Sequence, residues 1–224
     1  MEFVSTQFIL ALLSIIVIDL VLAGDNAIVI GMAARTLPNH LQTKAIVYGT
    51  VAAVLIRIGL TLTVSWLLQI PFLLAMGGLV LIWISYGLLV DQGQQHEVKT
   101  GENIVDAIKT IIIADVVMSL DNVIAIAGAA HGSFVLVVLG LLISVPIMVW
   151  GSTIILGLME RFPLIIYAGA AVLAWTAARM ITEEPFFERF FQSPAIHYGF
   201  MAAVVIGVLA VGFLRNRFST TRHS

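Results

Sequence analysis

Long apolar runs separated by short polar segments make up most of the chain from residue 6 onward. Each run is about as long as the roughly 18 residues that a helix needs to cross a bilayer, or longer, and most runs contain few charges. The pattern predicts seven membrane-spanning helices, at residues 6–34, 45–68, 71–90, 104–130, 133–159, 163–180 and 197–214. Very short links between the second and third spans and between the fourth and fifth predict antiparallel hairpins. The link from 181 to 196 carries phenylalanines beside charges, which predicts a short helix lying in the membrane interface.

The composition agrees with an all-α polytopic membrane protein that forms one membrane domain over residues 1–224. Of the 224 residues, 60% are hydrophobic and only 11% are charged, whereas about a quarter of the residues in soluble domains are charged. A soluble protein of this length could not bury so much apolar surface. The first span contains Asp19 and Asp25 and has no basic segment before it, so we expect a permanent span rather than a cleaved signal peptide.

The basic residues predict the orientation, because cytoplasmic loops of membrane proteins carry an excess of lysine and arginine. An outside N-terminus places the C-terminus inside, with residues 215–224 as a cytoplasmic tail. The inner side then holds Arg35, Lys44, Lys99, Lys109, Arg161, Arg215, Arg217 and Arg222, and the outer side holds only Arg179 and Arg189.

An internal repeat relates the first span to the fourth. Residues 18–34 read IDLVLAGDNAIVIGMAA and residues 114–130 read ADVVMSLDNVIAIAGAA, with eight of seventeen positions identical. Shared leucine, isoleucine, valine and alanine could align by chance in any two apolar helices. Chance does not easily place two aspartates and an asparagine in the same register, so we interpret the match as a true repeat.

A second match shows how long the repeat is. PFLLAMGGLVLIW from Pro71 aligns with PLIIYAGAAVLAW from Pro163, so the third span matches the sixth. Each repeat therefore has three helices (repeat one at 6–90, repeat two at 104–180), and an extra helix follows at 197–214. Since three is odd, the second repeat crosses the membrane in the opposite sense, as in inverted-repeat secondary transporters with a site at the repeat interface.

The repeated motif places carboxylates inside the bilayer. Each charged side chain at a helix centre costs roughly 2.5–3.5 kcal/mol on insertion scales, or on the order of 10 kcal/mol for four. The four are Asp19, Asp25, Asp115 and Asp121. Cations, protons, water or the mid-span Arg57 must compensate them, and we expect Arg57 to neutralise an aspartate. Intramembrane acids of this kind indicate a functional site.

Helical geometry separates the acidic positions of the first motif. Asp19 and Asn26 are seven residues apart and share a face, whereas Asp25 points about 120° away from Asp19 on a straight helix. Either the helix opens near Gly24, or Asp25 serves a neighbouring site. The second repeat has Ser119-Leu120 in place of Ala23-Gly24, so a break is less clear there.

Carboxylate and amide oxygens are hard ligands that suit Mn²⁺, Mg²⁺ or Ca²⁺. The chain has no cysteine and no mid-span histidine, which makes zinc and copper weaker candidates and excludes disulfides and thiolate sites. No nucleophile–base pair is present, so we expect no enzyme, no catalytic residue and no other cofactor. The net charge of −2 argues against nucleic acid as a partner.

The motifs DLVLAGDNAIVIG and DVVMSLDNVIAIAG, each opening a three-helix repeat, resemble the TerC family of integral membrane proteins, in its short seven-span YjbE-type branch. That family belongs to the lysine-exporter-like superfamily. The resemblance implies a multi-pass protein of the bacterial inner membrane, and a role in manganese export in a family named after tellurium resistance. It also implies a set of metal ligands, namely Asp19, Asp25, Asn26, Asp115, Asp121 and Asn122.

The expected function is therefore divalent metal transport and ion homeostasis, with Mn²⁺ efflux the favoured activity. The expected partners are the divalent cation and the lipid bilayer, and a homo-oligomer or a complex with other membrane proteins is compatible with the sequence. Two alternatives stay open. One is a Na⁺- or H⁺-coupled exporter of another solute, and the other is a non-transporting factor in membrane-protein assembly or in metalation of exported proteins.

Overall fold

The fold is all-helical throughout the part of the chain that the computed structural model describes, residues 6–22, 24–67, 70–90, 104–130 and 132–220. The side chains of a few helical residues, Asp121 among them, lie outside this description. The described helices are α1 (Thr6–Leu22), α2 (Gly24–Arg35), α3 (Asn39–Leu67), α4 (Leu73–Val90), α5 (Ile104–Ala129), α6 (Phe134–Arg161), α7 (Leu164–Thr182) and α8 (Pro194–Thr220).

Among the described residues, five helices are each long and apolar enough to cross a membrane, and two bent pairs bring the total to seven. In the first pair α1 meets α2 at an angle of 49°, and in the second α5 bends by 63° between Leu120 and Asn122. The predicted polytopic all-α class is confirmed. In the second repeat, where the sequence makes a break less clear, α5 bends more sharply than the first repeat does, without a glycine at the bend.

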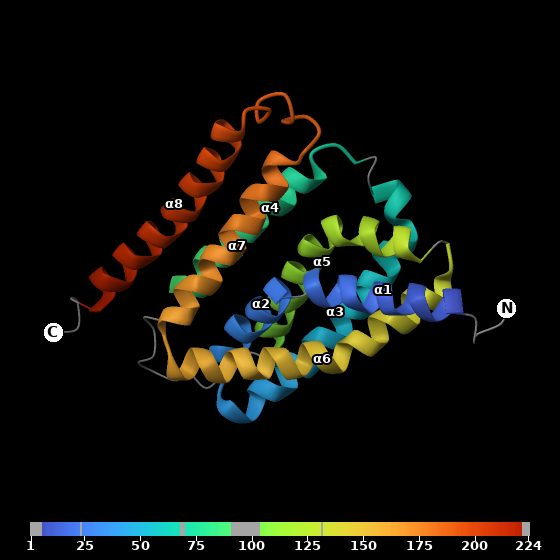
Figure 1. The fold of residues 1–224 in the computed structure, drawn as a ribbon. Helices are drawn as coiled ribbons and strands as arrows, with labels where there is room; N and C mark the ends of the chain where they lie inside the picture. Colours follow the sequence, from blue (N-terminus) through green and yellow to red (C-terminus); the bar gives the residue numbers. More distant parts are fainter. Residues whose placement is uncertain (1–5, 23, 68–69, 91–103, 131, 221–224) are drawn as a thin grey trace.

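The helices pack as the inverted repeat predicts. Equivalent helices of the two repeats contact each other, α3 against α6 and α4 against α7, and the contact of α3 with α5 matches that of α6 with α1 and α2. In Figure 1, α4, α7 and α8 run side by side along one flank, while α1 and α6 run across the other. The broken helices α2 and α5 contact members of both groups, so the repeated motifs lie between them.

The outer surface of this bundle is apolar. Exposed large side chains include Trp66 at 79% exposure and Leu164 at 78%, which water would not favour but lipid tails accept. Polar side chains such as Ser85, Ser144 and Ser152 are instead buried, and each donates a hydrogen bond to a backbone carbonyl. This inside-out distribution of polarity is what a membrane-embedded chain requires.

Matched glycines allow the matched helices to approach closely. A Cβ atom at Gly77 of α4 would lie 2.9 Å from Val117 of α5, and one at Gly169 of α7 would lie 2.8 Å from Ile28 of α2. At Gly78 the added atom would lie 2.5 Å from the backbone carbonyl oxygen of Ala177, which cannot move aside as a flexible side chain can. Small residues therefore set the α4–α7 separation.

We expect Gly78→Ala to destabilise the protein by about 1–3 kcal/mol, the usual cost of overpacking a tight interior. The matched control is Gly87→Ala on the same helix, where an added Cβ meets nothing within 4 Å. Thermal unfolding of the purified protein in detergent compares the two variants. Equal melting temperatures would mean that the α4–α7 contact does not depend on this glycine.

The link between α7 and α8 differs from its prediction. Instead of an interfacial helix, residues 183–193 form consecutive turns, with backbone hydrogen bonds such as Phe187 N–H to Glu184 O at 2.8 Å and Phe190 N–H to Phe187 O at 2.9 Å. Pro185 and the buried carboxylate of Glu184 explain the difference, because the chain folds back here to reach the start of α4.

Candidate functional site: a buried Asp–Arg–Asp centre

The two repeats meet at an arginine held by two aspartates. Nη1 of Arg57 in α3 donates to Oδ1 of Asp19 in α1 at 2.5 Å, and Nη2 donates to Oδ1 of Asp115 in α5. Arg57 and Asp19 are fully buried, and Asp115 is 4% exposed. The aspartates occupy equivalent positions in the two motifs, so the planar guanidinium joins the same residue of each repeat.

This centre keeps unused hydrogen-bonding capacity. With all three groups ionised, the two carboxylates and the guanidinium carry a formal net charge of −1. Within the described residues, Oδ2 of Asp19 and Nε of Arg57 have no hydrogen-bond partner, while Oδ2 of Asp115 accepts a 3.4 Å hydrogen bond from Ser119. A buried acceptor left without a donor costs roughly 1–3 kcal/mol. The centre therefore retains both negative charge and an open ligand atom.

Asp25 faces a different neighbour. It stands in the first turn of α2, where Oδ1 accepts a 2.9 Å hydrogen bond from the backbone N–H of Asn26. Its Oδ2 accepts a 3.3 Å hydrogen bond from Thr176 of α7. The first explanation for its direction is confirmed, since the helix bends before Asp25, and its carboxylate also contacts α7.

The asparagines of both motifs are buried. Asn26 is 1% exposed and Asn122 6%. Both polar atoms of the Asn26 amide lack a partner among the described groups, and such buried orphans call for an explanation. The amide oxygen is thus an available hard ligand. The side chain of Asp121 lies outside the described residues, so its predicted role stays a prediction.

Among the described residues, the predicted ligands do not gather into one coordination shell in this conformation. Within the described residues, no group of three or more acidic or histidine side chains gathers as a metal site. The structure instead unites Asp19 with Asp115 and leaves Asp25 and Asn26 near α7 and the helix break.

A third carboxylate, Glu184, clamps the start of α4. Its Oε1 accepts the N–H of Phe72 at 3.2 Å, and its Oε2 accepts those of Leu74 and Ala75 at 3.2 and 3.3 Å. Phe72 has a φ of +61°, which strains a residue other than glycine. Its ring packs on Phe186, with centroids 4.7 Å apart. The link after repeat two therefore holds the first turn of a repeat-one helix.

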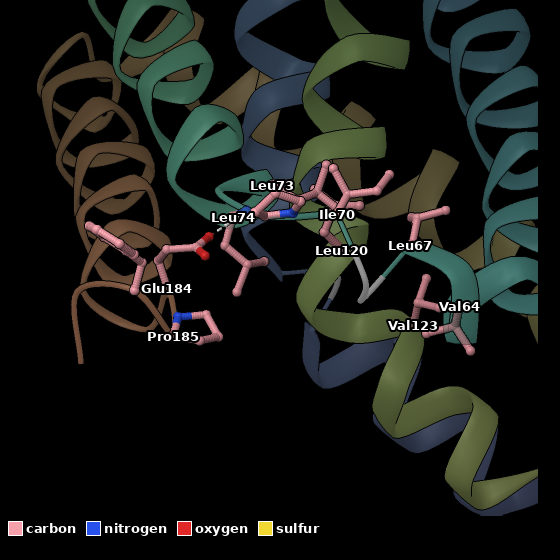
Figure 2. A pocket seen from close by; sticks show the side chains of 11 residues that line it. Val64, Leu67, Ile70, Leu73, Leu74, Leu120, Val123, Glu184 and Pro185 are labelled. Atoms are coloured by element: carbon pink, nitrogen blue, oxygen red, sulfur yellow. Dashed lines mark hydrogen bonds between the residues drawn. The ribbon is translucent and has the colours of Figure 1, made fainter. Parts of the chain in front are cut away.

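A cavity of about 390 Å³ lies beside this clamp. Figure 2 shows Glu184 and Leu74 on one side of it and Val64, Leu67 and Val123 on the other. Leu120 and Val123 from its lining flank the second Asp-Asn motif at the α5 bend. The lining is apolar apart from Glu184, whose oxygens already accept backbone N–H groups, so the cavity itself is no cation site.

Replacing Glu184 by glutamine should lower the stability by about 1–3 kcal/mol, because an amide nitrogen would face backbone N–H donors in a buried position. Glu188→Gln, an exposed glutamate of the same link, is the control. Melting temperatures in detergent report the difference. A Glu184→Gln variant that melts with the wild type would contradict the clamp.

Known proteins with similar sequences are also integral membrane proteins. The model of the integral membrane protein TerC family matches residues 4–220, nearly the whole chain. The chain belongs to the TerC family. Among TerC-type relatives, it is 49% identical over 178 residues to a Bacillus subtilis protein described as uncharacterized membrane protein YjbE, covering 80% of this chain and 82% of that protein.

More distant relatives are also membrane proteins of bacteria. The uncharacterized membrane protein YkoY of Bacillus subtilis is 23% identical over 75% of this chain, which spans only 58% of YkoY. The UPF0053 inner membrane protein YgdQ of Escherichia coli K12 is 26% identical, over 69% of this chain and 72% of YgdQ. No solved structure matches the chain. The sequence-based assignment to the TerC family is therefore confirmed, and with it the placement in a membrane.

Sequence analysis of this TerC protein did not identify every residue that forms contacts at or near the candidate site. Thr176 was missed because the matching position of repeat one is Ile84, so the repeat offers no hint of it. Glu184 was missed because it lies beside phenylalanines and other charges of a link that is predicted to lie in the membrane interface. Arg57 was singled out, since a mid-span arginine needs a partner, but its bond to both repeats could not be seen in the sequence.

Proposed function

We propose that this TerC protein transports a divalent metal ion across the bacterial inner membrane, with Mn²⁺ export as the physiological activity. One observation carries the proposal: equivalent aspartates of the two repeats, Asp19 and Asp115, converge in the apolar interior. A charged pair placed there is costly, and its retention at a repeat interface is typical of substrate sites in inverted-repeat transporters.

The proposed ligands divide into a centre and its neighbours. Asp19 and Asp115 bind the ion at the repeat interface, and the remaining predicted ligands complete its shell or pass it on, namely Asp25, Asn26, Asp121 and Asn122. The bends between α1 and α2 and within α5 would add backbone carbonyl oxygens as further ligands. Alternating access follows if the two repeats rock about the ion. Hard oxygen ligands favour Mn²⁺ over softer metals.

Calorimetry on the purified protein is the test of the proposed site. Mn²⁺, Mg²⁺, Ca²⁺ and Zn²⁺ are titrated into the wild type and into Asp25→Asn/Asp121→Asn. Mn²⁺ binding that the double variant loses supports the motif ligands, and Mn²⁺ flux into proteoliposomes then tests transport. Wild-type flux in Asp121→Asn would remove that residue from the ligand set, and no binding of any divalent ion would reject the proposal.

Two rivals have an observation in their favour. The net charge of −1 at the Asp–Arg–Asp centre suits one Na⁺ or H⁺, as a monovalent-coupled exporter of another solute requires. The pairing of both aspartates with Arg57 also suits a structural network in a factor for membrane-protein assembly or metalation. Competition of Na⁺ with Mn²⁺ in the same titrations separates the first rival, and a complete lack of cation binding favours the second.

The proposed direction needs the predicted orientation, with the N-terminus outside and the C-terminus in the cytoplasm. A reporter that is active only in the cytoplasm, fused after Ser224, should be active, and the same reporter before Met1 should be silent. The reverse pattern would overturn the orientation while leaving the ligand assignment untouched.

A further inference from the structure

The guanidinium of Arg57 occupies the position where the proposed cargo needs its ligands. It takes Oδ1 of both Asp19 and Asp115, the only two repeat-equivalent carboxylates that the described residues bring together. All three side chains are buried, and the guanidinium is the ionic partner of both carboxylates. A cation that uses the Oδ1 atoms of both aspartates must therefore displace the guanidinium from at least one of them.

Charge counting distinguishes the cargo classes. The centre has a net charge of −1, so a monovalent ion at the open Oδ2 of Asp19 would neutralise it with Arg57 still in place. A divalent ion added to the intact centre would leave a buried charge of +1. With the guanidinium displaced, the divalent ion and the two carboxylates sum to zero. Burial of net charge is unfavourable, so neutralisation of the Asp19–Asp115 pair by a divalent ion favours displacement of the guanidinium.

We propose that Arg57 is a resident counter-cation, whose guanidinium and the cargo cation occupy the Asp19–Asp115 pair alternately; this inference rests on the proposed transport function. In the empty protein, Arg57 compensates the aspartates and allows the unloaded centre to change its accessibility. When cargo arrives, it competes with the guanidinium. When cargo leaves, the guanidinium returns and prevents immediate rebinding.

Competition has an arithmetic consequence. If the guanidinium holds the centre for about nine-tenths of the time, the apparent affinity for cargo is about tenfold weaker than the intrinsic affinity. Removing the guanidinium should then strengthen cation binding. It should also slow transport, because no positive charge would replace the cation when it is released or neutralise the two aspartates while the empty protein changes its accessibility. A merely structural arginine predicts that binding and transport are lost together.

The experiment measures Mn²⁺ binding by calorimetry and Mn²⁺ flux in proteoliposomes, using the full chain. It compares the wild type with Arg57→Met, whose unbranched apolar side chain fills similar space, and with Arg161→Met as a control away from the centre. Arg57→Met is expected to bind Mn²⁺ about tenfold more tightly and to transport it about tenfold more slowly. Arg161→Met is expected to behave as the wild type in both measurements.

Other outcomes are decisive as well. Equal or weaker binding by Arg57→Met, with binding by the wild type intact, overturns the counter-cation and leaves the proposed function standing. No divalent binding by the wild type overturns both. If Arg57→Met does not fold, Arg57→Lys decides: its ammonium lacks the fork that holds two carboxylates at once, so tighter Mn²⁺ binding supports the competition, and unchanged or weaker binding overturns it.

Discussion

Asp115→Asn is expected to abolish cation binding and transport while leaving the protein at least as stable as the wild type. Loss of outer-shell partners of a metal site already costs roughly 10–100-fold in affinity, so loss of a direct carboxylate ligand should cost about a hundredfold or more. Stability behaves differently, because Arg57 and Asp19 remain as a neutral pair. The substitution removes the excess negative charge of the centre and leaves no charge without a partner.

This opposite response of binding and stability distinguishes a functional carboxylate from a structural one. Removing one partner of a structural buried ion pair usually costs about 3–5 kcal/mol. Asp106→Asn is the matched control on the same helix, since Asp106 is 71% exposed and pairs with Lys109. Calorimetry and melting temperatures are measured on both variants. Unchanged Mn²⁺ binding in Asp115→Asn, or a large loss of stability, would contradict the assignment.

The repeat explains why much of the fold and part of the site could be predicted. Apolar run lengths place the helix ends within six residues of those observed, because bilayer thickness sets helix length. The register of the two Asp-Asn motifs makes Asp19 and Asp115 equivalent, and inversion of one repeat about the other brings equivalent positions together. The sequence therefore predicts that Asp19 and Asp115 are equivalent and that Arg57 neutralises an aspartate, but it does not predict that Arg57 binds both.

Contacts that differ between the two repeats could not be predicted from the sequence. Asp25 bonds to Thr176, yet the matching position of repeat one is Ile84, so self-comparison cannot reveal the contact. The 63° bend of α5 has no glycine to indicate it, and tertiary packing decides it instead. Propensity is a weak prior in such positions, because packing against neighbouring helices routinely overrides it.

Glu184 makes long-range contacts that no local sequence pattern predicts. Beside Glu183 and among phenylalanines, it reads as an interfacial charge, but it is 4% exposed and accepts hydrogen bonds from backbone groups about 110 residues away. Such long-range capping leaves no local pattern, because any carboxylate carried to the right place would serve. The strained Phe72 beside it has no sequence marker either.

Arg57→Met should make the stability of the protein depend on divalent cations. Without the guanidinium, two buried carboxylates lose their only ionic partner within the described residues, and the loss of one partner from a buried ion pair costs about 3–5 kcal/mol. A divalent ion that binds this centre replaces the missing charge. At a hundred times its dissociation constant, such an ion returns about 2.7 kcal/mol, so Mn²⁺ should restore most of the lost stability.

Melting temperatures with Mn²⁺ and with a chelator measure this dependence. The charge-matched control is Asp19→Asn/Arg57→Met, which carries the wild-type net charge of −1 but has only one of the two carboxylates. It should be more stable than Arg57→Met in chelator and should gain little from Mn²⁺. An Arg57→Met protein that melts at the same reduced temperature with and without Mn²⁺ would show that the two aspartates need Arg57 for packing alone, and that a cation cannot take its place.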